Sequence, residues 1–166
     1  MRLPNKASGK GWIAVVAFIL MMTASCVPEN IIWTDTYHFP GTCWKGDYRI
    51  SFKPDSAFLS ARCRDVKGVL SMRYGMDASV EDIPMVVEME YPSEGRFFSD
   101  TIRFNLLTAE RRTANNATTG IFESVYNINL PLTPSPGWNI TFYPASEHTE
   151  IRGLYTLTFE LLRNEK

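Results

Sequence analysis

Residues 85–106 read MVVEMEYPSEGRFFSDTIRFNL, which is two alternating runs joined by a turn. Hydrophobic residues occupy every second position of the first run, and Glu88 and Glu90 lie between them. Because successive side chains of a strand point to opposite faces, this period of two predicts half-buried antiparallel strands. Pro92 presets the φ angle of a turn and Gly95 accepts a positive φ, so the loop predicts a hairpin.

The same alternation recurs in short segments that are separated by Pro, Gly and polar turns. The clearest segment is Leu154–Leu162, where the alternation places Tyr155, Leu157, Phe159 and Leu161 on one face and Leu154, Thr156, Thr158 and Glu160 on the other. The other segments are residues 48–53, 69–74, 122–130 and 138–143. No long helical period interrupts them. The 166 residues are 45% hydrophobic and 21% charged, and one domain takes about 100–200 residues. We therefore predict an all-β fold, an antiparallel β-sandwich of about seven to eight strands, in one domain over residues 37–166.

The first 25 residues differ from the rest of the chain and resemble an export signal. Arg2, Lys6 and Lys10 supply positive charge, and an apolar core follows at residues 12–22. As a helix this core reaches only ~16 Å, at ~1.5 Å per residue. A bilayer-spanning helix needs about 20 residues. Residues 1–25 therefore predict a signal peptide, and the alternative is an uncleaved N-terminal anchor.

Small residues precede the first cysteine, as in a bacterial lipobox. Ala24 and Ser25 suit the two positions before Cys26. Thr23 stands three residues before the cysteine, where an aliphatic residue is usual. In a lipobox the cysteine is acylated after cleavage, and each buried CH₂ of an acyl chain contributes ~0.8 kcal/mol to membrane binding. We therefore predict lipidation at Cys26, followed by a tether over residues 26–36. The alternative is an ordinary signal peptide that leaves Cys26 as a free thiol.

The charge balance and the cysteine count argue against two classes of site. Lys and Arg number 17 and Asp and Glu 18, for a net charge of -1, so we predict no nucleic-acid partner. Cys43 and Cys63 either form a disulfide, worth ~3 kcal/mol for a loop of about 20 residues, or remain separate thiols. Neither cysteine has a close cysteine neighbour, and His38 and His148 are far apart. We predict no metal site and no cofactor.

No motif predicts catalysis, and we expect a non-enzymatic protein. A nucleophile elbow of the Gly-x-Ser-x-Gly type is absent from the sequence, and the alternation places Glu88 and Glu90 on an outward polar face. The candidate contact residues are Trp44 and Trp138, since exposed aromatic rings stack on sugars or anchor partner proteins. The alternative for each tryptophan is that it fills the core of the sandwich.

Three stretches carry a resemblance to a known family. They are YHFPGTCWKGDYRISF at residues 37–52, the segment 73–102 around the hairpin, and GLYTLTFE at residues 153–160. Together with Cys26 they resemble the gliding motility lipoprotein GldH family of Bacteroidota. Members of that family usually continue past the last strand, so a chain that ends at Lys166 resembles a divergent or shortened relative.

This resemblance implies a function that depends on contact instead of catalysis. It implies a lipid-anchored accessory or structural component of gliding or surface machinery. The expected location is the cell envelope, at the outer membrane, with the membrane and other envelope proteins as partners. The family is not tied to a reaction or to a catalytic residue. The alternative is a carbohydrate-binding surface lipoprotein that contacts a glycan through exposed tryptophans.

Overall fold

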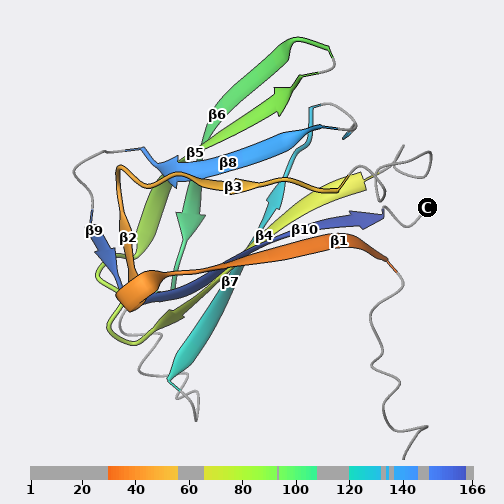
Figure 1. Cartoon of the computed structure of the whole chain (residues 1–166). Coiled ribbons are helices and arrows are strands. Elements are labelled where there is room, and N and C mark those ends of the chain that lie inside the picture. The colour runs from red at the N-terminus through yellow and green to blue at the C-terminus, as the bar shows by residue number, and fades with distance from the viewer. Residues whose placement is uncertain are drawn as a thin grey trace, which may run out of the picture.

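The computed structural model describes residues 30–55, 66–92, 94–107, 120–131, 134, 137–145 and 150–163. Strands dominate this part of the chain, and all their pairings are antiparallel (Figure 1). The elements are β1 (Ile31–His38), the 3-10 helix η1 (Pro40–Thr42), β2 (Cys43–Lys45), β3 (Ile50–Phe52), β4 (Val66–Gly75), β5 (Asp82–Tyr91), β6 (Arg96–Asn105), β7 (Ile121–Ile128), β8 (Asn139–Pro144), β9 (Glu150–Arg152) and β10 (Leu154–Arg163). Within the described ranges no helix has the length and hydropathy that crossing a bilayer requires.

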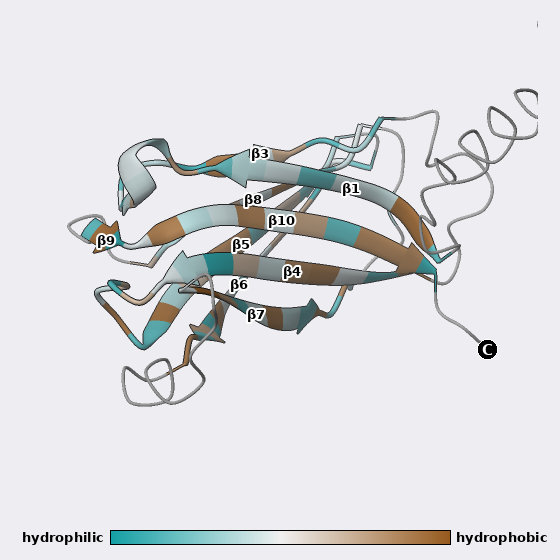
Figure 2. Ribbon diagram, turned by 90° about the horizontal axis from the view of Figure 1, so that it is seen from below, coloured by the Kyte–Doolittle hydropathy of each residue, from teal (hydrophilic) through white to brown (hydrophobic). Residues whose placement is uncertain are grey.

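Two four-stranded sheets form the layers of the sandwich, which confirms the predicted fold class. The first, here the β1 sheet, has the order β1-β10-β4-β7, and the second, the β5 sheet, has the order β3-β8-β5-β6. A short ribbon of β2 and β9 closes one end. Figure 2 shows the β1 sheet in front of the β5 sheet, with the edge strands β1 and β3 on the same side.

The predicted boundary between tether and domain is wrong. Residues 31–36 belong to β1, which pairs with β10 from Ile31 opposite Leu162 to His38 opposite Thr156. Trp33 fixes this strand on the core, because its ring lies 6.5 Å from Phe52 and 6.2 Å from Phe159 between centroids. Residues 26–29 and the predicted signal peptide lie outside the described residues.

The predicted hairpin of residues 85–106 is confirmed. Strands β5 and β6 pair in continuous register from Asp82 opposite Asn105 to Tyr91 opposite Arg96. The turn begins with a hydrogen bond of 3.0 Å from the Glu94 N–H to the Tyr91 carbonyl, and Gly95 takes the positive φ of 60°. Figure 1 shows this hairpin extending beyond the rest of its sheet.

The alternation predicted in the last strand holds along most of β10. From Leu157 to Leu161 every second side chain is buried between the sheets. The prediction is wrong at Tyr155, which is 37% exposed, while Leu154 is buried. The physical reason is a shift in register against β4 between Leu154 and Thr156, which moves the side chains on either side of the irregularity out of phase.

Candidate functional site

Both tryptophans that the sequence marks as candidate surface contacts are buried. Trp44 and Trp138 are each 1% exposed. The Trp44 indole N–H donates a 3.0 Å hydrogen bond to the Tyr48 carbonyl, and Trp138 packs 6.2 Å from the ring of Tyr91. Each therefore fills the core, which was the alternative for both, and the expectation of an exposed stacking surface is wrong for both. The fold buries the large apolar area of both side chains in its core.

A pocket of about 310 Å³ lies beside Trp44, at the end of the sandwich that holds η1 and β2. Its walls include Tyr37 from β1, Lys45 at the end of β2, and Asp47 and Tyr48 from the connection between β2 and β3. The Tyr48 side chain, which also lines the pocket, is 49% exposed. We call this the Tyr37–Tyr48 pocket.

Aromatic contacts and backbone hydrogen bonds build the walls of this pocket. The ring of Tyr37 lies 5.6 Å from that of Tyr48 and 5.4 Å from that of Phe39. The Phe39 N–H donates to the Tyr155 carbonyl at 3.0 Å, and the Tyr48 N–H donates to the Lys45 carbonyl at 2.9 Å. With the indole of Trp44 bonded to Tyr48, the backbone on both sides of the pocket is held in place before any ligand arrives.

The surroundings of the Tyr37 hydroxyl in the pocket raise its pKa. Burial, and then a hydrogen bond with Tyr48, raises the pKa of Tyr37 to about 12. Tyr37 therefore stays protonated at neutral pH and acts as a neutral donor and acceptor. Tyr37 therefore contributes a phenol group to the pocket.

A second hollow extends the pocket between the edges of the two sheets. It has a volume of about 140 Å³, is bounded by β1 and β3, and shares Tyr37 and Tyr48 with the larger pocket. Asp35 lines it from the β1 side, and its carboxylate accepts a 2.8 Å hydrogen bond from the Thr36 backbone N–H. A charged side chain on an edge strand, bonded to that strand's own amide, hinders the addition of another strand.

Cys43 also lines the Tyr37–Tyr48 pocket. Its thiol donates a 3.4 Å hydrogen bond to Glu150 Oε1, and burial, then this bond, raises the pKa of the thiol. A thiol held in its protonated form is a poor nucleophile. Cys63 and Cys26 lie outside the described residues, so the Cys43–Cys63 disulfide and the lipidation of Cys26 stay predictions.

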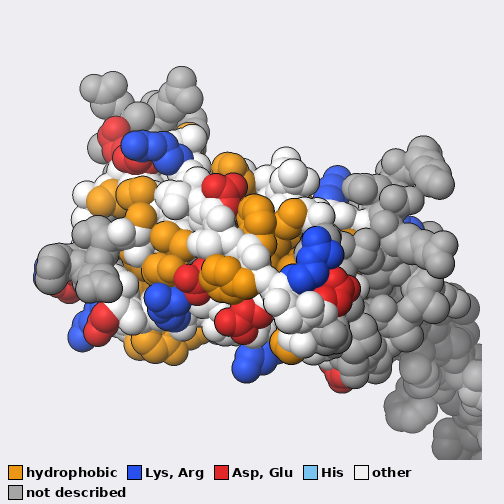
Figure 3. All heavy atoms as spheres, turned by 90° about the horizontal axis from the view of Figure 1, so that it is seen from above, with side chains coloured by type: hydrophobic (Ala, Val, Ile, Leu, Met, Phe, Trp, Pro, Cys, Tyr) orange, Lys and Arg blue, Asp and Glu red, His pale blue; other side chains and the backbone are white. Residues whose placement is uncertain are grey.

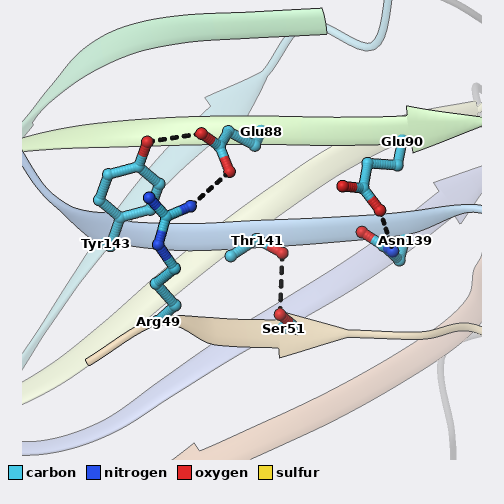
Figure 4. A network of polar contacts seen from close by, with 7 residues as sticks. All are labelled: Arg49, Ser51, Glu88, Glu90, Asn139, Thr141 and Tyr143. Atoms are coloured by element: carbon cyan, nitrogen blue, oxygen red, sulfur yellow. Dashed lines mark hydrogen bonds and ion pairs between the residues drawn. The ribbon is translucent and has the colours of Figure 1, made fainter. Parts of the chain in front are cut away.

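The outward face of the β5 sheet carries a polar network centred on Glu88 (Figure 4). The Arg49 guanidinium bonds one oxygen of Glu88 at 2.7 Å, and the Tyr143 hydroxyl donates to the other at 2.6 Å. Arg49 also lies over the Tyr143 ring, 3.9 Å from its centroid. Both oxygens of Glu88 are therefore engaged, and this bond to Glu88 is the main reason that the pKa of Tyr143 is raised.

Two further side-chain bonds extend this network across β3, β8 and β5. Ser51 and Thr141 share a 2.8 Å hydrogen bond, and the Asn139 amide donates to Glu90 at 2.8 Å (Figure 4). The predicted outward position of Glu88 and Glu90 is confirmed. Figure 3 shows acidic and basic side chains interspersed with hydrophobic ones on this face, so the described residues form no single-sign patch there.

Metal-binding side chains do not gather in the part of the chain that the structure describes. No group of three or more His, Cys, Asp or Glu residues there is arranged to hold a metal ion. His38 lies exposed at the end of β1, and His148 falls outside the described residues.

The comparisons with known proteins identify no family for this chain. No family model matches the chain, and no curated protein matches it significantly. Among solved structures, the chain is similar to dimeric latent PorU from Porphyromonas gingivalis, with 10% sequence identity and a TM-score of 0.33. That match covers 81% of this chain and spans only 13% of the length of PorU.

Proposed function

We propose that the protein is a non-enzymatic, lipid-anchored component of the cell envelope. In this proposal it serves as an accessory or structural part of gliding or surface machinery, as its resemblance to the GldH family implies. Its working principle is tethering, because a domain held at a membrane meets its partners at a raised effective concentration. The single observation that carries the proposal is the leader that ends in Thr23-Ala24-Ser25-Cys26.

The position of the first strand supports this proposal. Only residues 27–30 separate Cys26 from Ile31, the first residue of β1. The Asn30 carbonyl accepts a 2.8 Å hydrogen bond from the Arg163 N–H, so the chain enters the sandwich beside the end of β10. An anchor at Cys26 would hold this end of the domain close to the bilayer.

With an anchor at Cys26, the Tyr37–Tyr48 pocket would lie at the end of the domain that faces away from the membrane. Tyr37 is near the far end of β1, and strands rise ~3.3 Å per residue, so about 20 Å separate it from Ile31. Figure 1 shows β1 running from the entry of the chain to the end that carries η1 and β2. A pocket on the membrane-distal end suits contact with a partner or ligand outside the bilayer surface.

Metabolic labelling with palmitate tests the anchor. We expect the label to enter the wild type and a Cys43→Ser variant, and to be lost from Cys26→Ser, which should also leave the membrane fraction. Cys43→Ser is the matched control, because it removes a cysteine of the folded domain and keeps the lipobox. Label that persists in Cys26→Ser, or a leader still attached to the protein in cells, would refute the proposal.

Crosslinking in native membranes tests the role in envelope machinery. The expected result is a reproducible set of envelope proteins that copurify with the wild type and are lost with Cys26→Ser. Turnover of a substrate by the purified domain would contradict a non-enzymatic role.

The second candidate function, carbohydrate binding, is favoured by one observation, the half-exposed Tyr48 ring at the mouth of a pocket.

A further inference from the structure

We propose that the Tyr37–Tyr48 pocket binds a neutral pyranose ring of a glycan, with Tyr48 as the stacking surface and Lys45 and Asp47 as partners for hydroxyl groups. This proposal goes beyond the anchoring function and does not depend on acylation of Cys26. It also moves the predicted carbohydrate contact from the buried tryptophans to a tyrosine that solvent reaches.

The size of the pocket fits a single ring. Its volume of about 310 Å³ is at the lower limit of small-molecule sites, which run from about 300 to 1,000 Å³. The adjoining hollow between β1 and β3 adds about 140 Å³, enough for part of a neighbouring sugar unit and too little for a bulky ligand. The walls are held by backbone hydrogen bonds on both sides, so little ordering is needed on binding.

The aromatic surface fits the apolar face of a sugar. Tyr48 packs against Tyr37 with the rings at 33° to each other, and it remains 49% exposed. A pyranose ring presents several C–H groups on one face and hydroxyl groups around its rim. The exposed part of the Tyr48 ring offers an apolar surface with a hydroxyl at its edge, which matches this division.

The charges of the pocket favour a neutral, hydroxyl-rich ligand. Lys45 and Asp47 line the pocket two residues apart, and both are exposed. Neither side chain is engaged in an ion pair within the described residues. A phosphate would be repelled by Asp47 and an ammonium group by Lys45, whereas sugar hydroxyls donate to a carboxylate and accept from an ammonium group.

An extended peptide is a poorer occupant of the same groove. Strand addition requires free backbone groups on the edge strand. At this groove the Thr36 N–H is already bonded to the Asp35 carboxylate at 2.8 Å. The charge of Asp35 would also be desolvated by a second strand, so the geometry favours a compact ligand over a peptide.

A glycan array probed with the full chain in detergent tests the proposal, followed by calorimetric titration of the best-bound glycan. We expect Tyr48→Ala to weaken binding at least about tenfold, which corresponds to about 1.4 kcal/mol. Tyr48→Phe should retain most of the affinity because the stacking ring remains. Asp47→Asn should weaken binding, since the amide is a poorer acceptor for sugar hydroxyls than the carboxylate.

Two controls make the test specific to the pocket. Phe97→Ala removes an aromatic residue that is 61% exposed and does not line the pocket, and it should leave binding unchanged. Cys26→Ser should also bind normally, which separates this proposal from the anchoring function. If Tyr48→Ala proves unstable in urea unfolding, Asp47→Asn replaces it as the test variant. The Asp47 side chain is exposed, so its replacement should leave the fold intact.

Three results would overturn the proposal. The first is an array on which the wild type binds no glycan above background. The second is a bound glycan whose affinity is unchanged by both Tyr48→Ala and Asp47→Asn. The third is binding confined to anionic glycans, which would contradict the argument from Lys45 and Asp47.

Discussion

Replacing Gly153 by alanine should destabilise the sandwich far more than the loss of one glycine usually does. Gly153 directly precedes the last strand with a φ of +79°, and a Cβ there would lie 2.5 Å from Ala78 N and 2.6 Å from Ala78 Cα. Both atoms belong to the backbone, so no side chain can move aside. The connection between β4 and β5 would have to shift away from Gly153.

The loss of unfolding free energy in Gly153→Ala has two parts. An L-residue in the left-handed region costs about 1–2 kcal/mol. The shift would also break the bonds that join the two segments, from the Gly75 N–H to the Gly153 carbonyl at 2.8 Å and from the Ser79 N–H to the Arg152 carbonyl at 3.2 Å. Each such bond contributes about 1 kcal/mol, so we expect Gly153→Ala to lose about 3–4 kcal/mol of unfolding free energy.

Urea unfolding followed by tryptophan fluorescence measures this loss, and Gly137→Ala is the matched control. Gly137 has a φ of +82°, and a Cβ at that position would have no heavy atom of a described residue within 4 Å. The control therefore loses only the conformational part. With an m value of about 2 kcal/mol/M, the two variants should differ by about 1 M in midpoint. Equal midpoints would refute the reasoning that close backbone packing requires glycine at position 153.

Three further predictions concern the edge strand and the tyrosines. Asp35→Ala frees the Thr36 N–H on the edge strand β1, so sedimentation should show more self-association than in the wild type, and an unchanged monomer would contradict this role. Glu88→Ala should lower the pKa of Tyr143, because the bond to Glu88 is the largest cause of its rise; titration of phenolate absorbance measures the shift, and no change would contradict the assignment. Folded Tyr37 holds its proton up to about pH 12, so unfolding free energy should fall as the pH rises between about 10 and 12, where the unfolded state releases that proton first. The raised pKa of Tyr143 adds to the same decline, so Tyr37→Phe should make the decline shallower in urea unfolding, and an unchanged slope would assign it to other groups.

Side-chain alternation could predict which face of a strand is buried, and it did so where strands are long and paired on both sides. In β5 and along most of β10, which are both paired on two sides, apolar residues at every second position face the core. Alternation does not say which strands are neighbours. The placement of β1 and β3 at the same side of the two sheets, which creates the hollow between them, depends on pairings between segments far apart in the chain.

The residue pattern did not predict strand β1, because β1 is an edge strand. Its middle residues, Thr34, Asp35 and Thr36, are exposed on both faces and resemble a polar linker. The one available signal was the hydrophobic pair that flanks them, Trp33 and Tyr37, which are spaced an even number of residues apart and so share a face. Aromatic residue type alone did not reveal exposure either, since Trp44 is buried and Tyr48, four residues later, is half exposed.

The pocket and the polar face of the β5 sheet are connected through the short strand β3. Arg49 bonds Glu88 at 2.7 Å and Ser51 bonds Thr141 at 2.8 Å, so side chains on the outer face hold β3 against its sheet. On the pocket side, the Trp44 indole holds the Tyr48 carbonyl at 3.0 Å. Each exposed ion pair is worth only about 0–1 kcal/mol, but these bonds act on a strand of three residues. The position of the Tyr48 ring therefore depends on residues of the outer face that do not line the larger pocket, which makes them positioning residues for any ligand bound there.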